Sequence, residues 1–183
     1  MLTIRPLASD NADCFNRADT RYLAGELVQI RVTRKGFVPD YVPVSSATWQ
    51  TYQPPRSLQR LLTSGSVPHE CFFAFLDDQF AGQAVVAKAS HGLAELIDLQ
   101  VDVKLRRQSI ASSLLDACVD WAQKQRCHGL LAQTTDFNPV ACQFFDHSSF
   151  QLGGVDKLRY WADDGGGLVP SMRPSALTFY RFF

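Results

Sequence analysis

Residues 101–115 read VDVKLRRQSIASSLL, and within them a strand pattern gives way to a helix pattern. Upstream, Leu93 to Val103 alternates apolar and polar residues, as a half-buried strand does. Downstream, Ser109 to Gln125 carries apolar residues at the 3.6-residue period of an amphipathic helix. Backbone N–H groups converge where such a helix begins, and with the helix dipole they form an anion site. The segment therefore predicts a strand, a turn whose N–H groups could bind an anion, and a helix, although many strand-to-helix turns bind nothing.

The pattern on both sides extends this unit. Gly129 to Thr134 reads as a buried strand, so Leu93 to Thr134 contains a β-α-β unit whose two strands should be parallel. Further elements are a β-hairpin at 71–76 and 80–88, a helix at 138–148, and closing strands at 150–161 and 175–183. Before Cys71 the pattern is weaker. It predicts a helix at 10–23, a strand at 27–33 and a short helix at 57–62.

Composition and charge set the broad class. The 183 residues are 46% hydrophobic and 20% charged, which is typical of a globular chain and suits one domain over residues 1–183. Lys plus Arg and Asp plus Glu both number 18, so no basic excess favours a nucleic-acid or membrane partner. The five cysteines are scattered without zinc spacing, which predicts free thiols in a reducing cytosol and no metal. With no leader pattern and no long apolar stretch, we expect a soluble, cytoplasmic protein.

Two motifs resemble those of the GNAT acetyltransferases. Residues 106–111 read RRQSIA where that family has Arg/Gln-x-x-Gly-x-Gly/Ala, and residues 138–145 read NPVACQFF where it has Asn-x-x-Ala-x-x-Phe-Tyr. Within the family, the streptothricin acetyltransferases are most similar, through VDWA at 119–122, HGLL at 128–131, GGVD at 153–156 and FYRF at 179–182. This resemblance covers roughly residues 94 to 183. It implies an α/β GNAT fold, with a central, mixed, strongly bent sheet flanked by helices.

The resemblance also implies acetyl-CoA as co-substrate and assigns residues to it. The backbone N–H groups from Arg107 to Ser112 would hold the pyrophosphate, with charge from Arg106 or Arg107, while the backbone of Val101 and Val103 would hold the pantetheine arm. Asn138 would hydrogen-bond the cofactor, and Phe144 and Phe145 would lie along its acetyl end. The cofactor residues expected are Val101, Val103, Arg106, Arg107, Gln108, Ser109, Ile110, Ala111, Ser112, Asn138, Ala141, Phe144 and Phe145.

The chain departs from the family pattern at four positions. Ser109 and Arg107 stand where glycine is expected or common, and glycine would allow a positive φ and a close approach to phosphate. Phe145 replaces the tyrosine that often protonates the leaving thiolate, and a phenyl ring has no proton to give. Tyr160 and Tyr180 are other possible donors. Ile97 occupies the place of an acidic residue that often precedes the aspartate, here Asp98.

An alkyl ammonium must lose a proton before its nitrogen can attack a thioester, so a carboxylate base is expected. The two candidates are Asp98 and Glu95, which are three apart on one strand and should therefore point to opposite faces. We favour Asp98, which could also hold the cationic acceptor, although a solvated strand residue, or one hydrogen-bonded to a neighbour, fits it equally well. Asp136 is a further substrate-binding candidate, with a loop or capping role as the alternative.

The resemblance implies direct acetyl transfer, in a ternary complex, to an amine of a small molecule. The expected acceptor is an aminated antibiotic of the streptothricin or aminoglycoside type, and the expected role is resistance. Two alternatives stay open: a degenerate GNAT that binds acyl-CoA without efficient catalysis, and an acetyltransferase of protein amines. The sequence leaves the oligomeric state open, and a homodimer is one state that the chain could adopt.

Overall fold

The computed structural model describes residues 1–55, 57–65, 67–160 and 173–183. Its strands are β1 (Leu2–Pro6), β2 (Arg21–Thr33), β3 (Gly36–Thr51), β4 (His69–Leu76), β5 (Gln79–Lys88), β6 (Leu93–Val101), β7 (Gly129–Thr135), β8 (Gln151–Asp156) and β9 (Ala176–Phe182). Its α-helices are α1 (Ser57–Ser64), α2 (Ile110–Lys124) and α3 (Pro139–His147), and short 3-10 turns cover η1 (Ala12–Cys14) and η2 (Val103–Leu105).

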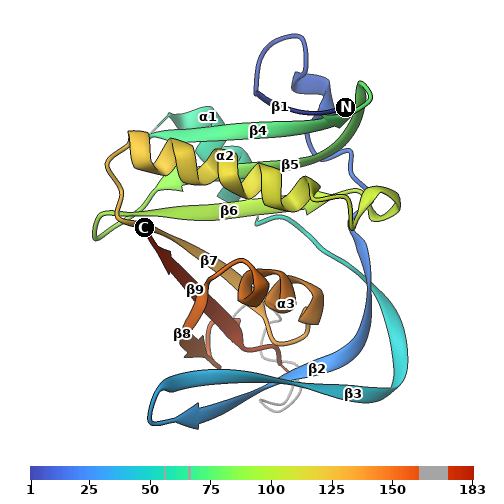
Figure 1. Ribbon diagram of the computed structural model, residues 1–183, viewed down its shortest axis with the longest axis vertical. Helices are drawn as coiled ribbons and strands as arrows, with labels where there is room; N and C mark the ends of the chain where they lie inside the picture. Colours follow the sequence, from blue (N-terminus) through green and yellow to red (C-terminus); the bar gives the residue numbers. More distant parts are fainter. Residues whose placement is uncertain (56, 66, 161–172) are drawn as a thin grey trace. The chain divides into compact units, whose positions relative to one another are not determined.

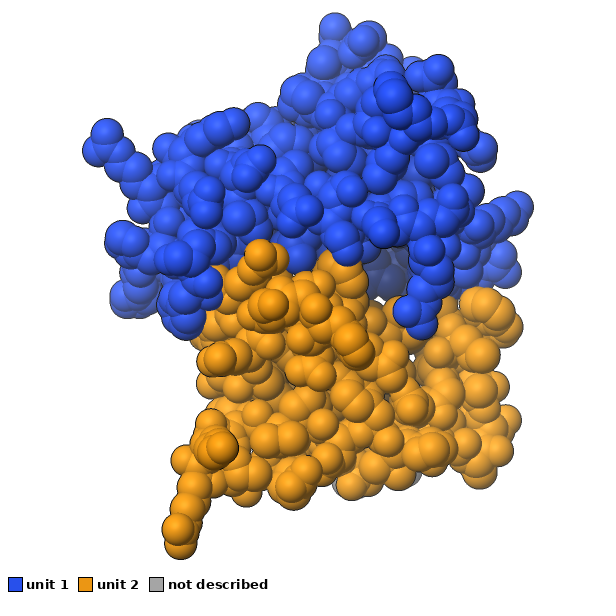
Figure 2. Space-filling view, in the orientation of Figure 1, with its two compact units in different colours: residues 1–21, 51–131, 182–183 blue, residues 22–50, 132–181 orange. Residues whose placement is uncertain are grey.

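The strands form two sheets in the described part of the chain. One has seven strands in the order β1-β4-β5-β6-β7-β9-β8, and the other is the two-stranded pair β2-β3. The chain separates into two compact units (Figure 2). Unit 1 comprises residues 1–21, 51–131 and 182–183, and unit 2 comprises residues 22–50 and 132–181. Each unit is described by itself below.

Unit 1 is a sheet with a helix on each face (Figure 1). The α2 helix crosses β4, β5 and β6 on one face, and its buried residues are Ile110, Leu114, Leu115, Cys118 and Ala122. The α1 helix covers the other face, where Leu58 packs with Cys71, Phe73, Phe75 and Val85. Alternate residues of β4 therefore face α1, as a strand with a period of two requires.

The predicted β4–β5 hairpin is confirmed. Asp77 and Asp78, the residues of its tight turn, have φ values of 48° and 62°, and two successive left-handed residues match the right-handed twist of the flanking strands. Helices α2 and α3 and strands β6 and β7 also form where they are expected, within two residues at each end. The closing strands are shorter than expected, at 151–156 and 176–182, and Trp161 lies outside the described residues.

The predicted helix over Asp10 to Leu23 is wrong. A single 3-10 turn forms instead, and strand β2 already begins at Arg21. Asn16 has a φ of 57°, a left-handed conformation that no helix can continue through. Its amide groups bond to side chains from other strands, so contacts distant in sequence outweigh the local helix pattern.

Strand β3 was not expected at all. Its sequence contains Pro39 and Pro43, which lack a backbone N–H and usually argue against a strand. The β2-β3 sheet has only two strands among the described residues, so one side of β3 is an edge where proline is tolerated. The hairpin belongs to unit 2, where Val28 of β2 donates its N–H to the carbonyl of Asp136 at 3.0 Å.

Candidate active site

The turn between β6 and α2 contains two left-handed residues, and neither of them is glycine. Strand β6 ends at Val101, so Val103 lies in the 3-10 turn η2 and not in the strand as expected. Arg107 has a φ of 63° and Ser109, the N-cap of α2, a φ of 59°. These are the two positions at which the family resemblance leads one to expect glycine. A left-handed conformation costs a non-glycine residue about 1–2 kcal/mol, so both side chains are held under backbone strain.

The start of α2 offers backbone donors. The Ser109 side chain makes no capping hydrogen bond, and the first turn contains no acidic residue. The first N–H groups of a helix have no partner within the helix, so these donors suit an anionic group. Arg107, Gln108, Ser109 and Ser112 are exposed, and Ala111 is half-buried. Ile110 turns its side chain into the core, at 1% exposure, so it can offer a ligand only its N–H.

The side chain of Arg106 hydrogen-bonds the backbone of this turn. Its Nε donates to the carbonyl of Val101 at 3.2 Å, and the side chain is half-buried. Desolvation lowers the pKa of its guanidinium, which nevertheless remains charged at any physiological pH. Arg107, by contrast, is exposed beside the start of α2. The two predicted phosphate cations therefore differ: Arg106 is partly committed to the backbone, whereas Arg107 faces solvent.

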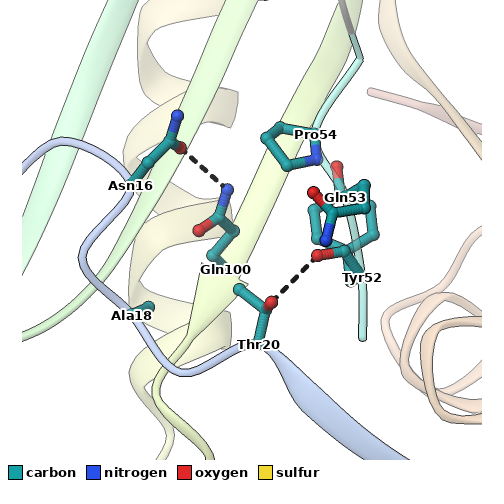
Figure 3. Close-up of a pocket in the computed structure, with 7 residues that line it drawn as sticks. All are labelled: Asn16, Ala18, Thr20, Tyr52, Gln53, Pro54 and Gln100. Carbon is teal, nitrogen blue, oxygen red and sulfur yellow. Dashed lines mark hydrogen bonds between the residues drawn. The ribbon is translucent and has the colours of Figure 1, made fainter. Parts of the chain in front are cut away.

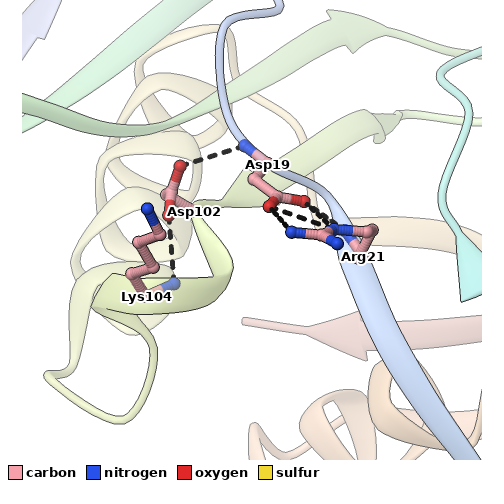
Figure 4. Close-up of polar contacts among 4 residues, drawn as sticks. All are labelled: Asp19, Arg21, Asp102 and Lys104. Carbon is pink, nitrogen blue, oxygen red and sulfur yellow. Dashed lines mark hydrogen bonds and ion pairs between the residues drawn. The ribbon is translucent and has the colours of Figure 1, made fainter. Parts of the chain in front are cut away.

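An N-terminal strap, residues 16–21, holds the far end of β6 (Figure 4). Asp102 Oδ2 accepts the N–H of Asp19 at 3.0 Å, while its Oδ1 accepts the N–H of Lys104 at 3.0 Å. Asp19 in turn accepts the N–H of Val103 on its carbonyl at 2.9 Å. The N–H of Val103 is therefore already engaged in a hydrogen bond to the strap. A side-chain hydrogen bond from Arg21 lowers the pKa of Asp19 to about 2, so this carboxylate is ionised wherever the protein is folded near neutrality.

A buried polar cluster lies on β5 and β6 of the same unit. Asp98, 1% exposed, accepts the Tyr52 hydroxyl at 2.9 Å and Gln83 Nε2 at 2.6 Å. It also accepts Gln100 Nε2 at 3.0 and 3.1 Å. Asn16 closes the group, because its Oδ1 accepts from both glutamines and its N–H donates to Gln83 Oε1. We call these five residues the Asp98 cluster.

The cluster keeps a carboxylate where solvent is excluded. Burial raises the pKa of Asp98 above that of an ordinary aspartate, while hydrogen bonds from Gln83, Gln100 and Tyr52 oppose the rise. Both carboxylate oxygens already have two partners, so Asp98 is not a solvated strand residue, whereas the alternative of a residue hydrogen-bonded to its neighbours agrees with these contacts. Direct contact between its carboxylate and an acceptor amine is blocked by the cluster itself.

The β5–β6 register explains why Asp98 faces this cluster. Asp98 lies opposite Val85, but Leu96 lies opposite Val86, so Ile97 is an extra residue in β6. Such a bulge interrupts the alternation of faces along a strand. Ile97 packs against the same apolar cluster as Val85, consistent with the interrupted alternation.

The prediction that Glu95 and Asp98 point to opposite faces is therefore wrong. Glu95 lies opposite Ala87 and Asp98 lies opposite Val85. Val85 and Ala87 are two apart on a strand and share a face, so Glu95 and Asp98 share it as well. The two carboxylates differ in exposure instead: Asp98 is buried, whereas Glu95 is half-buried.

A pocket of about 260 Å³ lies beside the Asp98 cluster in unit 1 (Figure 3). Asn16, Tyr52 and Gln100 belong both to the cluster and to the pocket wall. The lining residues are Asn16, Ala18, Thr20, Tyr52, Gln53, Pro54 and Gln100. Hydrogen-bonding groups dominate this wall, and all of it comes from the strap, the segment before α1 and strand β6. The polar residues Asn16, Tyr52, Gln83 and Gln100 were missed from sequence, where the visible signal was a glutamine within an apolar strand run.

The remaining predicted residues lie in unit 2. Asn138 caps α3, since its Oδ1 accepts the N–H of Ala141 at 3.1 Å. Asp136 accepts the N–H of Ser175 on Oδ1 at 2.8 Å and the N–H of Val28 on its carbonyl. Asp136 thus has a loop role through these hydrogen bonds, and substrate binding by Asp136 stays a prediction. Ala141 is half-buried on α3.

The two phenylalanines of α3 differ in burial. Phe145 is 6% exposed, with its ring 5.2 Å from that of Phe150 and 5.4 Å from that of Phe179 between centroids. Phe144 is half-buried and meets the Phe145 ring edge-on. A core role is therefore established for Phe145, and contact with a cofactor stays a prediction for both.

The three most deeply buried cysteines, Cys71, Cys118 and Cys142, offer no activated thiol. Burial raises the pKa of Cys71 and of Cys142 to about 12, and that of Cys118 further still. Neutral thiols are poor nucleophiles, which argues against an acyl-cysteine intermediate. Within the described ranges, no group of three His, Cys, Asp or Glu side chains could hold a metal ion. No described helix is long and apolar enough to cross a membrane.

Comparison with known proteins places these features in a family. The model described as the acetyltransferase (GNAT) family matches residues 34–150. Streptothricin acetyltransferase A of Bacillus subtilis (strain 168) is 28% identical over 89 residues, which are 49% of this chain and 51% of that protein. This chain thus aligns with about half the length of the curated relatives that it matches.

Solved structures share the fold over the whole chain. A Bacillus anthracis protein assigned as a streptothricin acetyltransferase, crystallised with acetyl coenzyme A, superposes with a TM-score of 0.84 at 21% identity, covering 100% of both chains. A nourseothricin acetyltransferase superposes with a TM-score of 0.77 at 18% identity, covering 99% of this chain and 98% of its own. The predicted fold, a mixed bent sheet with flanking helices, is confirmed.

Proposed function

This chain belongs to the GNAT family of acetyltransferases, and from that premise we propose that it transfers an acetyl group from acetyl-CoA to an amine of a small-molecule antibiotic. The acceptor we propose is of the streptothricin or aminoglycoside type. One observation carries the acceptor assignment: a polar pocket in unit 1 lies against a buried carboxylate, Asp98. Acetylation of such an amine removes a positive charge on which recognition of the drug's target depends.

The acetyl-CoA assignment rests on the turn after β6. The first turn of α2 presents N–H groups without a side-chain cap, and Arg107 lies exposed beside them. The left-handed conformations of Arg107 and Ser109 preserve the backbone shape that glycine would allow. These residues fit the pyrophosphate group of acetyl-CoA, and the thioester at the other end of that molecule supplies the activated acetyl group. No metal is needed for this chemistry, because the N–H donors and the helix dipole supply the positive potential.

The acceptor assignment rests on polarity and charge. The pocket wall combines amide, hydroxyl and carbonyl groups, which suit the hydroxyl and amide groups of a polar antibiotic. The Asp98 charge lies just behind Tyr52 and Gln100, in a region of low dielectric where its attraction for a cation is stronger than in water. Direct transfer from acetyl-CoA is the mechanism we propose, since burial keeps the thiols of Cys71, Cys118 and Cys142 neutral.

One experiment separates the candidate functions. Release of thiol from acetyl-CoA would be followed with a panel of streptothricins, aminoglycosides and amine-bearing peptides, alongside calorimetric measurement of acetyl-CoA binding. We expect thiol release with at least one antibiotic and none with the peptides. Acetyl-CoA binding without release for any acceptor would favour the degenerate GNAT, an alternative that Ser109, Phe145 and Ile97 support. Release with peptides alone would favour a protein acetyltransferase.

A further inference from the structure

Asp98 is too deeply buried to touch an acceptor, yet two residues of the pocket wall touch Asp98. Tyr52 donates its hydroxyl hydrogen to Asp98 Oδ1 at 2.9 Å, and Gln100 donates amide hydrogens to both oxygens. Both side chains also line the pocket. Among the described residues of the pocket wall, these two are the ones that hydrogen-bond Asp98, so a proton that leaves a molecule in the pocket would reach Asp98 by way of one of them.

The chemistry of the two groups differs. A phenol oxygen both donates and accepts, so it can take one proton as it gives up another. The amide nitrogen of Gln100 has no basic lone pair, and its hydrogens already go to Asp98 and to Asn16 Oδ1 at 3.1 Å. Gln100 can hold the carboxylate but cannot relay a proton to it.

We propose that Tyr52 is a catalytic residue that relays the proton of the acceptor ammonium to Asp98, an inference that rests on the proposed function. The N–H bond of the ammonium breaks, and its proton bonds to the Tyr52 oxygen. The proton formerly on that oxygen bonds to Asp98 Oδ1. The nitrogen keeps the electron pair of the broken bond and becomes the nucleophile. Tyr52 ends the step neutral, Asp98 ends it protonated, and the reverse relay to solvent restores both.

The surroundings suit Asp98 as the end of the relay. Gln83 and Gln100 fix the carboxylate in one orientation, with Oδ1 toward Tyr52. The elements packed around it contribute mainly uncharged groups: Val85 and Gln83 from β5, and Cys71 from β4, whose thiol stays neutral because burial raises its pKa to about 12. Glu95 shares the face of Asp98, two pairs farther along the β5–β6 register. Protonation of the Asp98 carboxylate in these surroundings neutralises a buried negative charge and creates no new one.

Tyr52 is itself held in place. Its N–H donates to the Thr20 carbonyl at 3.4 Å, and its own carbonyl accepts the Thr20 hydroxyl at 2.9 Å (Figure 3). Pro54 and Pro55 follow, which restrict the backbone after it. The strap and the segment before α1 therefore position the hydroxyl, which meets the requirement that a relay group be within hydrogen-bond reach of its partner.

The test compares two acceptors of different basicity with Tyr52→Phe. The probes are the best antibiotic amine from the panel and a weakly basic one, such as an alkoxyamine or hydrazide, which is already neutral at pH 7. We expect the variant to lower kcat for the antibiotic by roughly 100-fold at pH 7, the usual worth of a proton-transfer group. The loss should be small for the weakly basic acceptor, and it should shrink for the antibiotic as the pH rises. Acetyl-CoA binding should not change.

Two further variants protect the conclusion. Tyr41→Phe removes the same atom from a β3 tyrosine outside the pocket and should keep the wild-type kcat. Asp98→Asn should lower kcat for the antibiotic as much as Tyr52→Phe does. The double variant should lose no more kcat than either single variant, because both substitutions interrupt the same relay.

Several results would overturn the relay. Wild-type kcat in Tyr52→Phe at pH 7 would do so, and so would an equal loss with both acceptors at every pH, which would indicate a structural role. Additive losses in the double variant would count equally against it. A wild-type protein that releases no thiol with any amine would mean instead that the proposed function has failed, and the relay with it.

Discussion

The strained residue Ser109 marks the cofactor turn. At a φ of 59°, glycine would adopt the left-handed conformation without the Cβ contact that strains serine. We expect Ser109→Gly to raise the free energy of unfolding by about 0.5–1 kcal/mol, which is the strain relieved less the extra entropy of glycine in the unfolded chain. Urea denaturation measures it. Ser112→Gly, the same change in the first turn of the helix, is the control and should lower the free energy by about 0.5 kcal/mol. A loss at both positions would refute the strain argument.

The buried carboxylate Asp98 predicts a pH dependence of stability. Burial raises its pKa in the folded state above the unfolded value, so the folded protein binds the proton more tightly. This contribution is fully present below the unfolded value of 3.8 and is lost as the pH rises through the raised folded value. We expect the stability of wild type relative to Asp98→Asn to fall as the pH rises from about 4 toward neutrality. Urea unfolding of both proteins across that range measures the difference, and a constant difference would contradict the prediction.

At the scale of elements, the contact between β5 and β6 depends on Gly82. A Cβ built there would lie 2.2 Å from the backbone carbonyl oxygen of Gln100, which no side-chain rotation can relieve. We expect Gly82→Ala to lower the free energy of unfolding by about 3 kcal/mol, because the two strands must separate where the Asp98 cluster is built. Chemical denaturation measures the loss. Gly25→Ala on β2 is the control, since its Cβ would meet Ala47 at an ordinary 3.6 Å. Equal effects at the two glycines would show that close approach is not the cause.

The bulge in β6 is the other decisive element. If β6 had no bulge and Ile97 were an ordinary strand residue, the alternation of faces would place Asp98 on the face that α2 covers, away from Tyr52 and Asn16. Position and residue type together therefore make the candidate site: the strand supplies the carboxylate, and the bulge decides which side of the sheet receives it.

At the scale of the whole molecule, a ligand that binds only the folded chain stabilises it by mass action. Acetyl-CoA at 100 times its dissociation constant should raise the free energy of unfolding by about 2.7 kcal/mol. Thermal denaturation with and without acetyl-CoA measures the shift. Pantetheine, which lacks the pyrophosphate, serves as the comparison. An equal shift from both compounds would mean that the turn at Arg106 to Ala111 contributes no binding.

Much of the fold follows from local pattern. The β4–β5 hairpin, β6, α2, β7 and α3 are short-range structures, in which period, turn residues and caps all lie within a few positions of one another. The same is true of the turn after β6, whose N–H donors come with the start of any helix. Local pattern could not predict the 10–23 segment, because the conformation of Asn16 depends on its hydrogen bonds to β5 and β6. It could not predict β3 either, because a strand with Pro39 and Pro43 depends on its pairing with β2.

Sequence alone was therefore enough for the family, the helix that begins at Ile110, and Asp98 as a residue of interest, since each depends on residue type and spacing. Tertiary structure decided what Asp98 can do. Its burial, its partners Tyr52, Gln83 and Gln100, and its shared face with Glu95 arise from a strand register and a bulge. Register is set by pairing between strands distant in sequence, and one extra residue reverses the face of every side chain after it, which no local pattern records.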